Sequence, residues 1–376
     1  MNQRPDSTQR RLVESLRRER PIALARPEDF ALGEPAHIDP RRVLEDPSYS
    51  LYCFDPASGA ALFVEMDDAG AAEHAAFYYQ AQAERAVAVV SMPMETFHRL
   101  ALEIPEPPRG VVIVHSVGRC GSTLLSKVLQ ALPEVMSLSE PDEFTQLAHL
   151  RGDGTMGDDE VRSLLESSVR WRCKPRAGQP AAMVAIKTRA EVLAIADLMS
   201  VSFRGHKHLF LYCDALAWIR TTARNWPPEI SVYDEQRNRE WQDQWSTLLP
   251  ILRTMPPLNR AETRIVGWIV GMEGYLALRD AGLEILAIRY EDLVACPRKT
   301  LGEAIEFCGL PVTDWRAIDE VLGRDSQAGT MFDREERRKL AFDFTPDLEQ
   351  NVRDLIAARP ALLRPDVVLP GTLGCA

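Results

Sequence analysis

Residues 111–129 read Val-Val-Ile-Val-His-Ser-Val-Gly-Arg-Cys-Gly-Ser-Thr-Leu-Leu-Ser-Lys-Val-Leu, and the fold prediction starts from this stretch. A run of β-branched residues passes through a glycine-bearing turn into an amphipathic pattern, which predicts a strand, a tight loop and a helix. Gly118 and Gly121 allow the backbone to bend sharply and to approach an anion closely. Ser122 and Thr123 fall where a new helix leaves N–H groups unpaired. The stretch therefore predicts a loop that holds a phosphate or a sulfate.

This loop is not a Walker A loop. That pattern requires Gly-Lys followed by Ser or Thr, whereas Ser122 follows Gly121 directly. A different cation, Arg119, precedes the second glycine. Taken alone, the pattern also fits an ordinary glycine turn between a strand and a helix, so the other segments of the chain have to be weighed with it.

Length and composition indicate a globular protein with one large α/β domain and a smaller appendage. The chain has 376 residues, of which 45% are hydrophobic and 26% are charged. No apolar run is long enough for a membrane span, and the N-terminus lacks the apolar core of a signal peptide. We therefore expect a cytoplasmic protein without a membrane partner.

Charge and cysteine usage narrow the partners further. The net charge of −11 disfavours nucleic acid and other long polyanions, so we expect a small or neutral acceptor molecule. The seven cysteines are scattered singly and form no C-x-x-C pair. This predicts neither a disulfide scaffold nor a zinc site, and we expect no metal. The oligomeric state is not indicated.

The chain is expected to have three parts. Residues 1–25 are rich in arginine and predict a frayed helix or a mobile arm. Residues 26–105 predict a small α+β module with two strands, 50–54 and 60–65, around a turn. This module carries no chemical motif. A proline-rich linker then leads into residues 106–376, which predict the α/β domain.

Two motifs resemble the sulfotransferase family, whose donor is 3′-phosphoadenosine 5′-phosphosulfate (PAPS). The sequence Arg-Cys-Gly-Ser-Thr-Leu-Leu at 119–125 resembles the 5′-phosphosulfate loop of that family. The passage at 289–311, which begins Arg-Tyr-Glu-Asp-Leu and ends Phe-Cys-Gly-Leu-Pro, resembles a second recurrent passage. The resemblance implies a P-loop-like parallel sheet flanked by helices and a transferase that uses PAPS without a metal. It also implies that the loop backbone holds the 5′-phosphosulfate, through Gly118, Arg119, Cys120, Gly121, Ser122 and Thr123.

Glu140 is a candidate general base because it follows a short predicted strand. The carboxyl ends of parallel strands are where open α/β sheets bind ligands. The alternative is a loop carboxylate that caps the helix starting near Asp142. Some sulfotransferases use a histidine directly after a Lys-Thr pair, but here that position is Arg189. Other branches use a glutamate, which favours Glu140 and leaves Glu143 second and His115 third.

Lys187 ends the buried strand predicted at 182–187. An ammonium group at the end of a strand can neutralise charge that develops on a bridging oxygen. In the sulfotransferases the corresponding lysine contributes to transfer of the sulfuryl group, so the resemblance implies this role for Lys187 beside Arg119. The alternative is a lysine in a surface ion pair.

The candidate site for the 3′-phosphate departs from the family. An arginine at a strand end and a serine eight residues later hold this phosphate in sulfotransferases, and here the two positions are Cys213 and Thr221. Arg220 and Arg224 are the candidates to supply the missing charge. In a late polar loop, Arg324 and Ser326 are further candidates, and an ordinary helix-capping loop is the alternative.

Residues 225–250 are rich in aromatic side chains and prolines. They predict a lid or an acceptor pocket, because tryptophan and tyrosine give large rigid contact surfaces beside a cleft. Core packing of Trp241 and Trp245, four residues apart on a helix, is the alternative.

These observations favour a sulfotransferase that moves a sulfuryl group from PAPS to a hydroxyl or an amine. Arg119, Lys187 and Glu140 would be its catalytic residues. One alternative is a nucleotide-dependent kinase on the same fold, with Asp214 as a ligand of Mg²⁺. The other is a non-catalytic nucleotide-binding protein, which the cysteine at position 213 favours.

Overall fold

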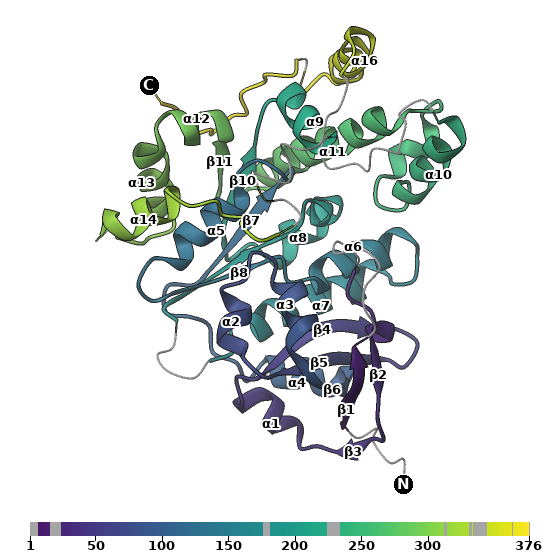
Figure 1. Ribbon diagram of the computed structural model, residues 1–376, viewed down its shortest axis with the longest axis vertical. Coiled ribbons are helices and arrows are strands. Elements are labelled where there is room, and N and C mark those ends of the chain that lie inside the picture. Colours follow the sequence, from purple (N-terminus) through teal and green to yellow (C-terminus); the bar gives the residue numbers. More distant parts are fainter. Residues whose placement is uncertain are drawn as a thin grey trace. The chain divides into compact units, whose positions relative to one another are not determined.

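The computed structural model describes residues 7–15, 24–175, 181–223, 234–311, 314–330, 333, 344–362 and 364–375 (Figure 1). Two compact units make up the chain, the first from Met1–Val112 and Leu132–Thr188, the second from Ile113–Ala131 and Arg189–Ala376. The division falls inside strand β7 (Val111–Ser116). The expected segments 1–25, 26–105 and 106–376 stay a prediction.

An antiparallel sheet occupies the N-terminal part of the first unit. Its strands are β1 (Thr8–Ser15), β2 (Phe30–Leu32), β3 (Ala36–His37), β4 (Tyr49–Asp55), β5 (Ala60–Met66) and β6 (Ala86–Pro93). Their order is β2-β1-β6-β5-β4, and β3 pairs with β1. The predicted pair of strands around a turn is confirmed as β4 and β5. Gly59 closes this turn with a φ of 66°, which glycine adopts without the steric cost that a side chain brings.

The first strand differs from the expectation for residues 1–25. The part of this segment that forms β1 is a strand, paired antiparallel with β6, and not a helix. Gln9 helps to fix it, because its amide donates hydrogen bonds to Tyr49 Oη at 3.1 Å and to Glu65 Oε2 at 2.5 Å. The sequence of β1 has no alternating apolar pattern and includes the charged pair Arg10 and Arg11, so it did not predict a strand. Pairing with β6 specifies the strand instead.

Parallel strands and helices complete the first unit. Strands β8 (Val135–Ser139) and β9 (Met183–Lys187) run parallel with every residue in register. The helical segments are η1 (Pro27–Asp29), α1 (Pro40–Glu45), α2 (Ala69–Glu73), α3 (Tyr78–Arg85), α4 (Met94–Ala101), α6 (Glu143–Gly152) and α7 (Asp158–Arg172). Both strands are buried along their whole length, as expected for strands covered on both faces.

The second unit contains strands in the order β11-β10-β7, where β10 is Lys207–Tyr212 and β11 is Ile285–Arg289. Strands β10 and β11 are parallel. The helical segments are α5 (Ser122–Gln130), η2 (Ala190–Ile195), α8 (Ala196–Ser202), α9 (Ala215–Ala223), α10 (Glu235–Trp245), η3 (Pro250–Thr254), α11 (Arg260–Asp280), α12 (Tyr290–Ala295), α13 (Pro297–Phe307), α14 (Trp315–Leu322) and α16 (Pro346–Ala357). The predicted combination of a parallel sheet flanked by helices with an N-terminal α+β module is thus confirmed.

Helix α11 supports the loop that follows β7. It starts with a capping box in which Asn259 and Glu262 satisfy each other's backbone N–H groups. Its buried face includes Trp268, Ile269 and Met272. At Gly271 a Cβ atom would lie 3.1 Å from a side-chain carbon of Val117, the residue that opens the loop. A glycine at this point lets the helix pack directly against the base of the loop.

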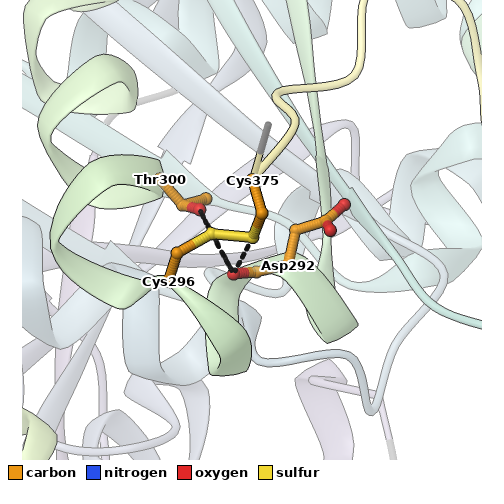
Figure 2. The surroundings of a disulfide bond; sticks show 4 residues. All are labelled: Asp292, Cys296, Thr300 and Cys375. Atoms are coloured by element: carbon orange, nitrogen blue, oxygen red, sulfur yellow. Dashed lines mark hydrogen bonds between the residues drawn. A yellow bond between two sulfur atoms is a disulfide. The ribbon is translucent and has the colours of Figure 1, made fainter.

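The structure contains a disulfide bond, which corrects the expectation drawn from scattered cysteines. Cys296, between α12 and α13, is bonded to Cys375 near the C-terminus, with the two Cα atoms 6.0 Å apart (Figure 2). The two sulfur atoms lie 3.4 and 3.5 Å from the main-chain oxygen of Asp292. Seventy-nine residues separate the two cysteines, and no spacing motif in the sequence marks such a pair.

Among the described residues, no helix combines the length and the apolar character that a membrane crossing requires.

Two buried histidines face each other from neighbouring strands of the second unit. His115 Nε2 and His208 Nδ1 are 2.9 Å apart, and the rings are nearly parallel. His208 Nε2 lies 3.1 Å from the carbonyl oxygen of Phe203 and must donate to it. The proton between the rings therefore belongs to His115 Nε2, a tautomer inferred from the hydrogen-bond network. Burial lowers the pKa of both histidines, that of His208 to about 4.

This pair predicts a loss of stability in mild acid. The unfolded histidines titrate near 6.5 and the folded His208 near 4, so the unfolded chain binds more protons between these values. The contribution of the neutral buried histidine to the free energy of unfolding is therefore fully present above pH 6.5, and it is lost as the pH falls toward 4. For His208 alone we expect a loss of about 2 kcal/mol between pH 7.5 and pH 5. Urea unfolding of the wild type and of His208→Gln at both pH values measures it. An equal pH dependence of the two proteins would contradict the prediction.

Candidate active site

The loop between β7 and α5 has an unusual backbone. Gly118, Arg119 and Gly121 have φ angles of 77°, 55° and 86°, all in the left-handed region. Arg119 carries a side chain there, which costs on the order of 1–3 kcal/mol and is found mainly at functional sites. Turns that combine right- and left-handed residues aim successive backbone N–H groups toward one side, which is the geometry of known anion-binding concavities. The first N–H groups of α5, which have no acceptor within the helix, follow this turn directly.

Side chains of the second unit hold this backbone in place. The N–H of Gly118 donates to Ser116 Oγ at 3.2 Å, and its carbonyl accepts from Trp218 Nε1 at 2.8 Å. Cys120 points inward, since its thiol donates to the carbonyl of Leu211 at 3.2 Å. Ser116 Oγ also lies 3.2 Å from Ser122 Oγ. The Cys120 side chain therefore points away from the loop surface, and only its backbone can face a ligand.

The two sequence motifs pack against each other at Gly121. A Cβ atom on Gly121 would lie 3.0 Å from the Tyr290 ring and 3.3 Å from Leu293. Both residues belong to the Arg-Tyr-Glu-Asp-Leu passage and form the start of α12. This passage therefore supports the loop from behind, and the position admits only glycine without rearrangement.

A late loop reaches the loop between β7 and α5 through a residue that the sequence did not single out. Arg119 Nη1 donates to Gln327 Oε1 at 2.7 Å, and Gln327 Nε2 lies 3.5 Å from Thr123 Oγ1. Its neighbour Ser326 is one of the residues predicted for the 3′-phosphate. Arg324 is 78% exposed and lies 3.9 Å from Glu320. No local signal marks Gln327, because the contact joins segments about 200 residues apart.

Two of the residues proposed for the 3′-phosphate make contacts with other side chains or with the helix backbone. Thr221 Oγ1 donates to the carbonyl of Ala217, one turn earlier on α9. Arg220 pairs with Glu349 at 2.6 Å and lies over the ring of Phe344. Arg224 lies outside the described residues. The roles of Thr221, Arg220 and Ser326 stay predictions.

The first unit brings Lys187 and Glu140 together. Lys187 ends β9, and Glu140 directly follows β8, whose last residue is in register with Lys187. The N–H of Glu140 donates to the carbonyl of Lys187 at 2.7 Å, and the two side chains form an ion pair. Their side chains are 3% and 15% exposed. Glu140 has a φ of 62°, so this candidate base is also held in the left-handed region.

Glu143, the second candidate for the base, is a structural residue. It is fully buried and forms a two-point ion pair with Arg172 on α7, with Nε–Oε1 at 2.6 Å and Nη2–Oε2 at 2.5 Å. Arg172 also donates to Ser50 Oγ and to the carbonyl of Leu51 on β4. Its guanidinium lies 5.2 Å from the centre of the Tyr78 ring. Both carboxylate oxygens of Glu143 accept hydrogen bonds from Arg172, and the side chain is fully buried. The molecule that receives the sulfuryl group therefore cannot reach it.

Two other candidates are occupied elsewhere. His115 is fully buried against His208. Asp214 caps α9, since its Oδ1 accepts from the N–H of Ala217 at 2.8 Å. Across the described part of the chain, no group of three or more histidine, cysteine, aspartate or glutamate side chains is arranged to hold a metal ion.

The aromatic segment is only partly described. Residues 225–233 lie outside the described residues, and α10 begins at Glu235. The ring centres of Trp241 and Trp245 on α10 lie 5.7 Å apart. Whether this segment closes over an acceptor stays a prediction.

Comparison with known proteins gives similarity at the level of solved structures only. No family model matches the chain, and no curated protein matches its sequence. A sulfotransferase from Alicyclobacillus acidocaldarius is 12% identical over 70% of this chain and 98% of its own, with a TM-score of 0.42. A mouse sulfotransferase complexed with PAP is 14% identical over 67% of this chain and 85% of its own, with a TM-score of 0.36. Retinol dehydratase in complex with androsterone and inactive cofactor PAP is 15% identical over 73% and 87%, with a TM-score of 0.36.

Proposed function

We propose that this chain transfers a sulfuryl group from PAPS to a hydroxyl or an amine of a small acceptor. The observation that carries the proposal is the backbone of the loop from Gly118 to Thr123. It holds Arg119 in a strained conformation at the entry to α5 and presents N–H groups without a Walker A lysine. A concavity built in this way suits the sulfuryl and phosphate oxygens of PAPS. It requires no metal to neutralise a triphosphate.

The chemistry assigns a role to each charged candidate. The acceptor oxygen or nitrogen attacks sulfur, a new bond to sulfur forms, and the bond from sulfur to the bridging phosphate oxygen breaks. Arg119 and the N–H groups of the loop offset charge on the transferring group. Lys187 stabilises the negative charge that the bridging oxygen gains as 3′-phosphoadenosine 5′-phosphate (PAP) leaves. Glu140 takes the proton of the acceptor.

Gly121→Ala tests the loop directly. The added Cβ meets the Tyr290 ring at 3.0 Å and the φ of 86° disfavours any side chain, so the loop must distort. We expect the affinity for PAP, measured by calorimetry, to fall at least about tenfold, which corresponds to about 1.4 kcal/mol. Gly59→Ala is the matched control, because Gly59 also has a positive φ, 66°, but has open space around it.

The same calorimeter separates the proposal from a kinase. Titration of the wild type with PAP and, separately, with ATP and Mg²⁺ should give binding of PAP and none or far weaker binding of ATP. Tight binding of ATP that depends on Mg²⁺ would overturn the proposed function. PAP binding without transfer from radiolabelled PAPS to any member of a broad acceptor panel would indicate a non-catalytic binding protein.

A further inference from the structure

Within the second unit, α11 contacts both α9 and α10 (Figure 1). Tryptophans and arginines gather at these contacts. The Cζ atom of Arg264, on α11, lies 5.6 Å from the ring centre of Trp218 and 5.0 Å from that of Trp245. One turn earlier, Arg260 lies 4.0 Å from the ring centre of Trp241. Guanidinium groups stack on indole faces because they are flat and weakly hydrated. Arg264 is thus held between two aromatic side chains from two different helices.

Arg264 is a partly buried cation with no anion in direct contact among the described residues. Its Nε is buried, and no hydrogen bond or ion pair joins Arg264 to another described residue. Glu191 acts on it only through space, and burial lowers the pKa of the guanidinium, which nevertheless stays charged. Indole faces attract a cation but accept none of its five N–H donors in the plane of the group. A cation that is partly withdrawn from water is usually paired, so an anionic group of a ligand would be stabilised at this position.

A side chain that contacts Arg264 also contacts the loop between β7 and α5. Trp218, one of its two flanking rings, donates its indole N–H to the carbonyl of Gly118. One turn further along α11, Trp268 donates its indole N–H to the carbonyl of Cys213, the residue that follows β10. Arg264 therefore lies beside Trp218, which joins α9 to the loop, and one turn from Trp268, which joins α11 to the carboxyl end of β10. Ligands bind at such strand ends in α/β sheets.

We propose that Arg264, held between Trp218 and Trp245, binds a second anionic group of the ligand whose first anionic group lies in the loop. The group is a phosphate or a carboxylate, since the planar guanidinium offers paired N–H donors that match two oxygens of either. This inference rests on the proposed function. Two sources supply such a group, the 3′-phosphate of PAPS or an acidic group on the acceptor. In the second case the acceptor is acidic rather than neutral.

The decisive measurement compares PAP with adenosine 5′-phosphate, which lacks the 3′-phosphate. Both are titrated by calorimetry into the wild type, Arg264→Gln and the control Arg279→Gln, an exposed arginine near the end of the same helix. If the donor supplies the anion, Arg264→Gln lowers the affinity for PAP about 10- to 100-fold, the range for a charged hydrogen bond. The affinity for adenosine 5′-phosphate then changes less than about twofold. The control keeps both affinities.

If the affinity for PAP is unchanged in Arg264→Gln, a second experiment tests whether the acceptor supplies the anionic group. Transfer from radiolabelled PAPS is measured with acceptors paired as free acid and methyl ester. A loss of kcat/KM for the acids alone supports the inference with the acceptor as the source. Equal behaviour of acids and esters overturns it. An equal loss for PAP and adenosine 5′-phosphate, with a lower Tm, also overturns it, because Arg264 would then only support the loop through Trp218.

Failure of the proposed function gives a different result. A wild type that does not bind PAP would overturn sulfuryl transfer but not the anion site. The probe is then inorganic phosphate alone, and the readout is its effect on Tm. A phosphate-induced rise of Tm in the wild type and in Arg279→Gln that is lost in Arg264→Gln supports the anion site. An equal rise in all three proteins, or none, overturns it.

Discussion

Replacing Arg172 by alanine is expected to lower the free energy of unfolding by about 3–5 kcal/mol. The variant leaves the Glu143 carboxylate fully buried without the guanidinium that now binds both of its oxygens. Burial already raises the pKa of Glu143, and Arg172 is the group that opposes this rise. The carboxylate must therefore either stay charged without a partner or take up a proton on folding. Ser50 Oγ and the carbonyl of Leu51 lose a donor as well.

Arg170→Ala is the matched control for this change. Arg170 lies on the same helix as Arg172 but is partly exposed, and its Nη2 atom is 3.7 Å from Glu106 Oε1. An exposed ion pair of this kind contributes about 0–1 kcal/mol to the free energy of unfolding. Urea unfolding of both variants at pH 7.5 measures the difference. The double variant Arg172→Met and Glu143→Leu should recover part of the lost stability, because it removes both charges together. Equal stability of Arg172→Ala and Arg170→Ala would contradict the structural role of the pair.

The fold could be predicted where periodicity and glycine placement act locally. The strand, loop and helix at 111–129 follow from β-branched residues, Gly118 and Gly121, and the structure has these elements as β7 and α5. The strand β1 could not be predicted in this way, since its residues alternate weakly and its pairing with β6 joins positions about 80 residues apart. The disulfide between Cys296 and Cys375 is a contact of the same long-range kind. Spacing along the chain does not encode such contacts.

The candidate site shows the same limit at the level of single side chains. Lys187 and Glu140 could be placed close together because strand ends meet at one edge of a parallel sheet, and their ion pair follows from the register of β8 and β9. Their catalytic roles stay predictions. Glu143, three residues further on, has the same chemistry and a similar place in the sequence. Only the fold shows that Arg172 binds it in the core. The contacts of Gln327 with Arg119 and of Arg264 with two tryptophans could not be predicted, because amide and guanidinium groups outside motifs carry no local signal.

Replacing Lys187 by alanine is expected to reduce sulfuryl transfer about 10²- to 10³-fold, the usual loss for one group that stabilises developing charge. The Lys187 ammonium group is almost inaccessible to water, with 3% of the side chain exposed, so water screens its charge only weakly. Because the charge on the bridging oxygen appears only as the bond to sulfur breaks, the loss should fall on kcat. Affinity for PAP should change much less. Stopped assays with radiolabelled PAPS give kcat, and calorimetry gives the affinity.

The ion pair with Glu140 makes the effect of Lys187→Ala separable from a structural one. Glu140 is 15% exposed, so it can be hydrated when its partner is lost, and we expect Tm to fall by only a few degrees, for a loss of about 1 kcal/mol. Glu140→Gln keeps the shape but not the charge, and it should also lower kcat. If the two residues act on one transition state, the double variant loses much less than the product of the two single losses. Full activity of Lys187→Ala would remove the lysine from the mechanism. Strictly multiplicative losses would instead mean that Lys187 and Glu140 act in separate steps.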